Sequence, residues 1–327
     1  FRPPAYPYRL AGAFKLLGVA RQHSRFTVAR VVAALLSMAT VVLIALIGAR
    51  LWSRRVGALA AVFAAVYPPF LMVDSSTLSE SLFIPLELAG LLAVIELRRS
   101  RGAYPWAAVA GLLAGLAALT RGNGLILLIP FAVAAASAPG RARRDAARTT
   151  ALLVAVAIAS IAPWTVRNAE QLHAFVPVTT EAGYTLDGLF NSYSYAHRML
   201  WSVPARDLVA LFRVHPPPKE SAWSGDLISD ALHFIGRHPA SVPEAGFWNT
   251  LRLFDLYQPG YDRLINDGLG TDHFVTHLAV YSVYPLLVLA VAAMPLGVAR
   301  RLPGFIWLML GLLLVTTVFA TIGTVRY

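Results

Sequence analysis

Long apolar runs separated by short polar turns dominate the chain from residue 29 onward. A helix needs about 20 apolar residues to cross the hydrocarbon core of a membrane. Eight runs approach this length, and they predict spans at 29–49, 56–73, 81–97, 103–119, 124–139, 149–166, 276–298 and 304–323. Because a soluble fold rarely buries so many apolar helices, the pattern favours an all-α polytopic membrane protein with about eight transmembrane helices.

Composition supports this interpretation. Hydrophobic residues make up 57% of the chain and charged residues 14%, and the mean hydropathy is +0.61. A soluble protein carries roughly 25% charged residues, so the balance is that of a membrane protein. The chain contains no cysteine, which excludes disulfides and thiolate chemistry.

Basic residues are sorted among the turns, and short loops rich in Arg and Lys face the cytoplasm. The turns at 74–80 and 120–123 hold a single arginine, Arg121. The alternate turns hold twelve arginines: Arg50, Arg54, Arg55, Arg98, Arg99, Arg101, Arg141, Arg143, Arg144, Arg148, Arg300 and Arg301. We therefore expect the alternate turns to be cytoplasmic. The net charge of +11 then suits anionic lipid, and no nucleic-acid partner is expected.

Four parts follow from this topology. Residues 1–27 would end an outer loop with an interfacial helix, and residues 28–166 would form a six-span bundle. Residues 167–275 would form a helical segment on the outer face, followed by two further spans in 276–327. Within the outer segment, 224–236 and 241–257 are amphipathic, and Ser241 and Glu244 stand at capping-box spacing. Since the chain begins at Phe1 and ends directly after an apolar run, we expect it to be an internal piece of a longer protein.

Three carboxylates lie near the turn 74-DSSTLSESLF-83. Asp74 and Glu80 are candidate catalytic groups at the predicted outer interface, although Glu80 also fits a helix cap with Thr77. Glu87 lies seven residues after Glu80, on the same helical face and about 10 Å deeper. An ionisable group at that depth faces a cavity or a partner, so Glu87 is a substrate-binding candidate, with a protonated structural glutamate as the alternative.

Three arginines depart from the charge rule of outer segments. Arg121 lies in 119-LTRGNG-124, Arg167 in 162-APWTVRN-168 and Arg326 in 323-GTVRY-327. Each is able to extend to lipid headgroups. Three guanidinium groups around one outer cavity would instead bind a phosphate or diphosphate, because arginine offers paired donors to phosphate oxygens.

Metal binding has a weaker signal, and the sequence contains no G-x-G-x-x-G motif for dinucleotide binding. Asp272, His273 and His277 place two imidazoles four residues apart, but spacing specifies no third ligand, so interface histidines are favoured over a metal site. A divalent cation stays open as a cofactor, and no other cofactor is expected. The 111-GLLAG-115 match to GxxxG predicts close helix packing.

In the order of its motifs, the chain resembles bacterial polytopic glycosyltransferases of the GT-C superfamily, closest to the branch of protein O-mannosyltransferase-like and aminoarabinose transferase-like enzymes. The matching pieces are 2-RPPAYP-7, the SESLF hairpin, LTRGNG in place of an LTRP-like turn, PWTVRN with 175-FVPVTTEAGY-184, and the closing VRY. Asn168 and Tyr327 complete two of these motifs and are further substrate-binding candidates. Gly122 and Asn123 replace the usual proline, so the resemblance does not specify the backbone conformation of this turn.

The resemblance implies a polyprenyl-phosphate-linked sugar as donor, a cell-envelope acceptor, and an active site on the outer face of the bacterial cytoplasmic membrane. It also implies a catalytic Asp in a first outer loop, which would precede 2-RPPAYP-7 and hence this chain. Two alternatives remain: a transporter or flippase for a polar lipid, and a scaffold for cell-envelope assembly. A carrier predicts an internal repeat, which the sequence does not show.

Overall fold

The computed structural model describes residues 2–75, 78–100, 102–202, 219–258, 273–295, 297 and 302–320. Within these ranges every regular element is a helix, as the sequence predicts. The chain divides into two compact units. The bundle unit comprises residues 3–161 and 263–310, and the second unit comprises residues 1–2, 162–262 and 311–327.

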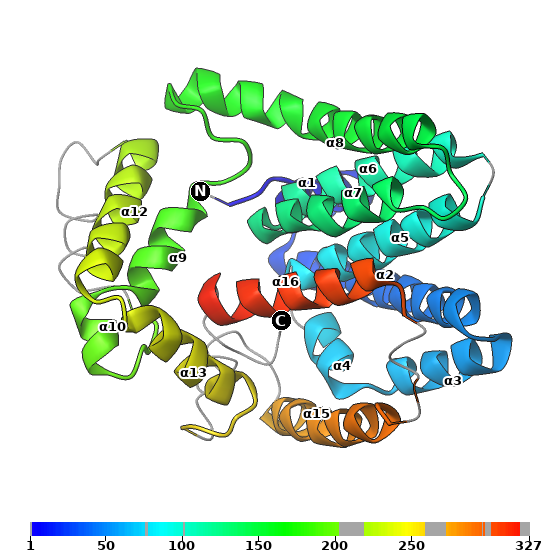
Figure 1. Cartoon of the computed structure of the whole chain (residues 1–327). Coiled ribbons are helices and arrows are strands. Elements are labelled where there is room, and N and C mark those ends of the chain that lie inside the picture. The colour runs from blue at the N-terminus through cyan, green and yellow to red at the C-terminus, as the bar shows by residue number, and fades with distance from the viewer. Residues whose placement is uncertain are drawn as a thin grey trace. The chain divides into compact units, whose positions relative to one another are not determined.

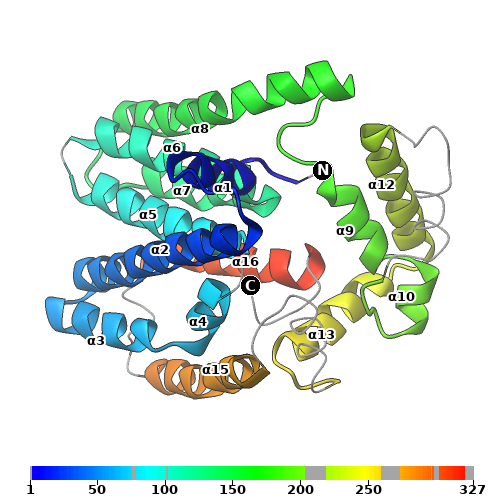
Figure 2. The ribbon, with the colours of Figure 1, turned by 180° about the vertical axis from the view of Figure 1, so that it is seen from behind.

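The bundle unit is built from helices that run beside one another (Figures 1 and 2). Helix α5 packs against α2 and α6, α7 packs against α5, and α1 packs against α2 and α6. Helix α15 packs against α4. The bounds are α1 (Ala5–Leu16), α2 (Gln22–Leu51), α3 (Arg54–Ala65), α4 (Pro68–Ser75), α5 (Glu80–Arg99), α6 (Ala103–Thr120), η1 (Gly122–Leu127), α7 (Leu128–Ala136), α8 (Arg143–Leu172, first part), α15 (His273–Ala293) and α16 (Gly304–Ala320, first part).

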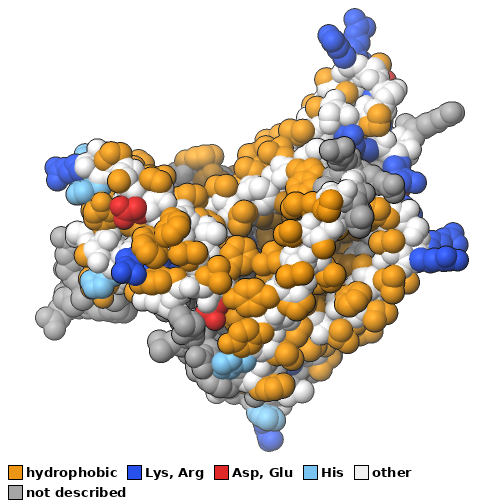
Figure 3. Space-filling view, turned by 60° about the horizontal axis from the view of Figure 1, so that its bottom comes forward, with side chains coloured by type: hydrophobic (Ala, Val, Ile, Leu, Met, Phe, Trp, Pro, Cys, Tyr) orange, Lys and Arg blue, Asp and Glu red, His pale blue; other side chains and the backbone are white. Residues whose placement is uncertain are grey.

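Three of the described helices, α2, α6 and α8, are long and apolar enough to cross a membrane. Shorter apolar helices cover Gly122–Ala136, His277–Ala293 and Gly304–Phe319. Helices α2, α3 and α15 expose large apolar side chains such as Met38, Phe63 and Val288. Figure 3 shows hydrophobic side chains over most of the visible face and basic side chains at its margins. A surface of this kind suits lipid rather than water.

Two of the eight predicted spans are not continuous α-helices. The run predicted at 56–73 is interrupted, because α3 ends at Ala65 and α4 begins at Pro68. Proline lacks the backbone N–H of a continuing helix, so Pro68 and Pro69 fit a new first turn. The run predicted at 124–139 begins as the 3₁₀ helix η1 and continues as α7.

Glycine at position 124 lets η1 fold back against the end of α6. A Cβ added to Gly124 would lie 2.6 Å from the carbonyl carbon of Ala117, which is too close for any other residue. The Gly-Asn-Gly sequence that replaces the family's usual proline therefore forms a tight turn directly after Arg121.

Arginines of the predicted cytoplasmic turns bind the C-terminal ends of helices. Arg98 Nη1 donates to the Ala134 carbonyl at 2.7 Å, and Arg99 Nη1 donates to the Arg50 carbonyl at 2.9 Å. Arg141 Nη2 donates to the Leu97 carbonyl at 3.0 Å. The last carbonyls of a helix have no partner within it, and a cation is favoured there. These arginines therefore stabilise helix ends, whatever their side of the membrane.

The GxxxG motif lies where α6 meets α8, so the predicted close packing is confirmed. A Cβ on Gly111 would lie 2.2 Å from the Leu153 carbonyl oxygen. A Cβ on Gly115 would lie 1.8 Å from the Ser160 hydroxyl oxygen and 3.0 Å from the Ala157 carbonyl oxygen. Small residues here let the two helix backbones approach each other closely.

Replacing Gly111 with valine should separate α6 from α8 and lower stability by about 1–3 kcal/mol, the usual effect of overpacking. The measurement is the melting temperature of the detergent-purified protein. Gly311→Val is the matched control, because a Cβ at Gly311 meets nothing within 4 Å. Equal melting temperatures for the two variants would contradict the close packing.

The second unit contains α9 (Glu181–Leu189), α10 (Ser192–Ala196), α12 (Glu220–Arg237), α13 (Ser241–Leu253) and the second parts of α8 and α16. Its core consists of Leu189, Phe190, Met199, Ala231 and Ala245. The amphipathic patterns at 224–236 and 241–257 thus correspond to α12 and α13.

The capping-box prediction for Ser241 and Glu244 is wrong. Residue Ala240 precedes the first turn of α13 in a helical conformation, and no side chain caps this end. Ser241 is fully buried, its hydroxyl has no hydrogen-bond partner among the described residues, and its backbone N–H donates to the His238 carbonyl. The turn that begins at His238 supplies the acceptor that a capping side chain would otherwise provide.

Candidate functional site

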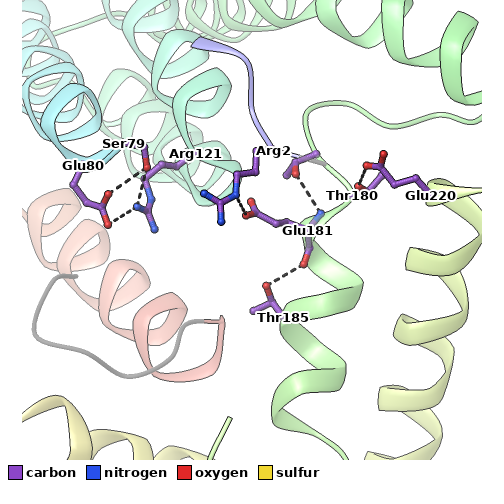
Figure 4. Close-up of polar contacts among 9 residues, drawn as sticks. Arg2, Ser79, Glu80, Arg121, Thr180, Glu181, Thr185 and Glu220 are labelled. Atoms are coloured by element: carbon purple, nitrogen blue, oxygen red, sulfur yellow. Dashed lines mark hydrogen bonds and ion pairs between the residues drawn. The ribbon is translucent and has the colours of Figure 1, made fainter. Parts of the chain in front are cut away.

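A buried ion pair joins the start of α5 to the end of α6. Arg121 Nη1 lies 2.7 Å from Glu80 Oε1, and the two side chains are 17% and 6% exposed. Ser79 Oγ donates to Glu80 Oε2 at 3.2 Å and accepts from Arg121 Nη1 at 3.2 Å. Figure 4 shows the three side chains turned toward one another. We call Ser79, Glu80 and Arg121 the hairpin cluster.

Helix geometry explains why these residues meet. Glu80 lies in the first turn of α5, where the helix dipole favours a negative charge. Arg121 follows α6 directly in an extended conformation (φ −146°, ψ 135°), so its side chain leaves the helix surface. Because α5 and α6 pack along their lengths, the turn before α5 and the turn after α6 come together. The sequence prediction that Glu80 and Arg121 converge is confirmed for this pair.

Tyr6 of α1 lies beside the hairpin cluster, and Arg9 of the same helix lies beside Tyr6. Burial raises the pKa of Tyr6, and the nearby Glu80 carboxylate raises it further, whereas Arg9 and the Ser81 hydroxyl lower it. The Arg9 guanidinium lies over the Tyr6 ring, 4.6 Å from its centroid. Sequence analysis predicted an interfacial helix here and did not single out Arg9. The available signal was spacing, since Arg9 lies three residues after Tyr6 and shares its side of the helix.

A small cavity borders the cluster on the side of α2 and α4. It has a volume of about 10 Å³ and is lined by Ser37, Thr40, Phe70, Val73, Glu80, Ser81 and Ile84. This space holds about one water and is too small for a sugar. Its hydroxyl groups and the Glu80 carboxylate would satisfy the hydrogen bonds of such a water. The cavity therefore extends the polar environment of Glu80 without forming a substrate pocket.

The other predicted carboxylates are less defined. Asp74 belongs to α4, but its side chain lies outside the described residues. Glu87 lies two turns beyond Glu80 on α5 and is half-buried. Its proposed contact with substrate stays a prediction.

In the second unit, side chains at the end of α8 donate hydrogen bonds to the segment 176–178 that follows the helix. Trp164 Nε1 donates to the Val178 carbonyl at 2.9 Å, and Thr165 Oγ1 donates to the Pro177 carbonyl at 2.9 Å. Asn168 is 3% exposed, and its Nδ2 donates to the Val176 carbonyl at 3.0 Å. The motifs PWTVRN and FVPV thus form one structural unit, and Asn168 has a structural function in addition to its predicted contact with substrate.

Arg167, the second predicted arginine, lies over the Trp164 ring at 4.7 Å from its centroid. Its Nη1 donates to Asn168 Oδ1 at 3.2 Å, and it makes no ion pair of the usual length with a described carboxylate. The site prediction for Arg167 therefore remains a proposal, supported by its positive charge and partial burial.

Further along the second unit, the start of α9 carries polar contacts shown in Figure 4. Glu181 Oε1 lies 4.0 Å from Arg2 Nε, and both side chains are at least 36% exposed. The Thr180 hydroxyl bonds the Glu220 carboxylate, and Ser224 Oγ donates to the Thr180 carbonyl at 2.7 Å. These contacts hold α9 against α12.

Three predicted residues lie outside the described part: Arg326, Tyr327 and Asp272. The side chain of His273 also lies outside it, so the histidine pair with His277 is not described. Among the described residues, no group of three or more His, Cys, Asp or Glu side chains is placed to hold a metal ion.

Comparison with known proteins identifies the family. A family model described as dolichyl-phosphate-mannose-protein mannosyltransferase matches residues 1–166, which include the hairpin cluster, Tyr6, Arg9 and Glu87. No curated protein and no solved structure matches the chain. The match supports the resemblance to the GT-C superfamily, whereas the branch proposed from the motifs stays a prediction. With its apolar helices, the chain is a multi-pass membrane protein that belongs to the dolichyl-phosphate-mannose-protein mannosyltransferase family of membrane glycosyltransferases.

Proposed function

We propose that this protein transfers a sugar from a polyprenyl-phosphate donor to a cell-envelope acceptor, which is a glycan, lipid or protein, on the outer face of a bacterial cytoplasmic membrane. The hairpin cluster carries the proposal, because a buried carboxylate and guanidinium meet at a predicted outer turn within the family-matched region. The uneven distribution of arginines among the turns supports the orientation.

In the proposed reaction, an acceptor oxygen or nitrogen attacks the anomeric carbon of the sugar. The bond from that carbon to the phosphate oxygen breaks, and the phosphate leaves with the electron pair. The acceptor proton passes to a carboxylate acting as general base. Positive groups stabilise the charge that grows on the leaving phosphate.

Asp74 and Glu80 are the carboxylates of this chain that we propose for the proton transfer. Both Glu80 oxygens already accept contacts, one from Arg121 and the other from Ser79. Accepting a proton would weaken one of these contacts, so Glu80 is best suited to positioning Arg121. Of the two, Asp74 is therefore the preferred assisting carboxylate, beside the principal Asp that the resemblance implies in an earlier outer loop. Arg121, Arg167 and Arg326 are proposed for the phosphate, and Glu87, Asn168 and Tyr327 for other parts of the substrates.

The direct test is a transfer assay with the full-length protein in proteoliposomes. Polyprenyl-phosphate sugars with a radiolabelled sugar are supplied together with envelope extract, with and without added Mg²⁺ or Mn²⁺. We expect the label to move from the lipid to an extractable acceptor. Movement of the intact donor across the bilayer, with no new glycosidic bond for any donor tested, would instead identify a flippase and reject the transferase.

A further inference from the structure

Arg9 is a half-buried cation: burial lowers its pKa, and the neighbouring Tyr6 hydroxyl raises the pKa against this effect. Its Nε, Nη1 and Nη2 atoms are all inaccessible to solvent, and none of them makes a hydrogen bond among the described residues. No ion pair joins Arg9 to a described carboxylate. Its guanidinium contacts the face of Tyr6, 4.6 Å from the ring centroid. A cation–π contact compensates part of the lost hydration but satisfies no N–H donor.

Other buried or half-buried arginines of this chain differ from Arg9. Arg98 and Arg141 donate to helix carbonyls, and Arg252 donates to two carbonyls and a side-chain amide. A buried charge without a partner costs several kcal/mol, which is why such groups are normally paired. Burial accordingly lowers the pKa of Arg9. An orphaned guanidinium of this kind fits a position where an anion binds.

The position of Arg9 indicates which kind of anion would bind there. Helix α1 packs against α2 and α6, and its Tyr6 is close enough to Glu80 and Ser81 to respond to their charge and hydrogen bonding. Arg9 contacts Tyr6 and therefore lies one side chain away from the hairpin cluster. Within that cluster the charge of Arg121 is balanced by Glu80 at 2.7 Å, whereas the charge of Arg9 is balanced by no described carboxylate.

We propose that Arg9 binds the phosphate group of the lipid-linked donor, with Tyr6 fixing the plane of its guanidinium. A guanidinium presents parallel N–H donors that match two phosphate oxygens, which an ammonium does not. This assignment rests on the proposed function for the identity of the donor. In this assignment Arg9, rather than Arg121, makes the main contact with the phosphate. The charge of Arg121 is already paired with Glu80, and the sequence pattern did not indicate Arg9.

The test measures binding without turnover. The detergent-purified full-length protein is titrated with a C55 polyprenyl monophosphate, the uncharged C55 polyprenol, phosphatidylglycerol and inorganic phosphate, with native mass spectrometry as the readout. The variants are Arg9→Met, Arg9→Lys and the control Lys15→Met. Lys15 lies on the same helix and is exposed, so this control removes one charge without touching Arg9.

We expect Arg9→Met to weaken polyprenyl-phosphate binding by at least about 10-fold, the usual effect of losing hydrogen bonds from a charged group. The polyprenyl-phosphate affinity of Arg9→Lys should lie between those of Arg9→Met and the parent protein. Lys15→Met should change this affinity less than 2-fold. Polyprenol binding should not change. The melting temperature of Arg9→Met should stay equal or rise, because the substitution removes a buried unpaired charge.

Other results would overturn the assignment. Equal polyprenyl-phosphate affinity in Arg9→Met and the parent would exclude Arg9 as the phosphate contact. If Arg9→Met lowers both the melting temperature and the affinity for polyprenol, Arg9 has a structural role instead. Phosphatidylglycerol binding as tight as that of the polyprenyl phosphate, and equally sensitive to Arg9, would identify a general phospholipid site. Because these titrations need no acceptor, Arg9-dependent binding without transfer in the proteoliposome assay would reject the transferase and leave the phosphate site standing.

Discussion

Arg121→Ala is expected to lower sugar transfer by about two to three orders of magnitude. Loss of one preorganised group at the reacting centre typically has an effect of this size. Arg121 also neutralises Glu80, so the variant leaves a buried carboxylate unpaired, which costs about 3–5 kcal/mol. Transfer rate and the amount of folded protein must therefore be measured together, in proteoliposomes of matched protein content.

Exchanging the two charges separates the chemical role from the structural one. The double variant Glu80→Arg with Arg121→Glu keeps a buried ion pair between α5 and α6 and should recover much of the folded protein. We expect sugar transfer to stay low, because the guanidinium now projects from the first turn of α5 and no longer from the turn after α6. If the double variant recovers both folding and transfer, the pair only joins the two helices, and its chemical role is rejected.

A second ion pair of α5 supplies the matched control. Glu96 binds Arg50 near the opposite end of the helix, and the Arg50 side chain is 42% exposed. Exposed pairs contribute about 0–1 kcal/mol, so Glu96→Gln should change stability and transfer little. An equal loss of transfer in Glu96→Gln and Arg121→Ala would mean that any ion pair on α5 matters, and would argue against a site at the hairpin cluster.

The sequence predicted two members of the hairpin cluster, Glu80 and Arg121, and did not indicate Ser79. The arginine count placed the turns before α5 and after α6 on the same face, and the packing of α5 on α6 brings these turns into contact. Topology therefore placed Glu80 and Arg121 on one face, whereas the direct ion pair between them follows from the packing of α5 on α6. The same topology related Arg326 to Arg121, and this part of the prediction is untested because Arg326 lies outside the described residues.

Hydropathy was a weaker guide to helix boundaries. The run at 56–73 is apolar throughout, but Pro68 and Pro69 divide it into α3 and α4. That signal was present in the sequence, since proline inside a helical pattern ends the helix near the preceding residue. The 3₁₀ start of α7 depends on a contact between Gly124 and Ala117, which the apolar pattern does not encode.

Arg9 and Arg252 show what pattern analysis does not reveal. Both are arginines within amphipathic helices, and charge alone places such residues on a solvated face. Their burial follows from tertiary contacts: Arg9 against Tyr6 and the neighbouring α2 and α6, and Arg252 against the turn at 198–199. The contacts of Arg252 join segments far apart in sequence and become visible only in the folded chain, whereas the contact of Arg9 with Tyr6 lies within one helix.

Arg252→Leu is expected to unfold the second unit locally. Arg252 is 2% exposed, and its Nη2 donates to the Arg198 carbonyl at 2.6 Å while Nη1 donates to the Met199 carbonyl at 3.2 Å. Arg198 and Met199 both adopt positive φ, 56° and 58°, which costs a non-glycine residue about 1–2 kcal/mol. Arg252 therefore holds two strained residues in place, and Met199 in turn is part of the core.

Removing this guanidinium leaves the buried Met199 carbonyl and the partly buried Arg198 carbonyl without this donor, and it releases the strained turn. Each loss is worth about 1–3 kcal/mol, so the second unit should lose at least about 3 kcal/mol. The readout is amide hydrogen exchange in 181–202 and 241–253, which should quicken by about two orders of magnitude. Arg237→Leu is the control, because Arg237 is exposed at the end of α12. If exchange in these segments is the same in both variants, Arg252 is not what holds the turn.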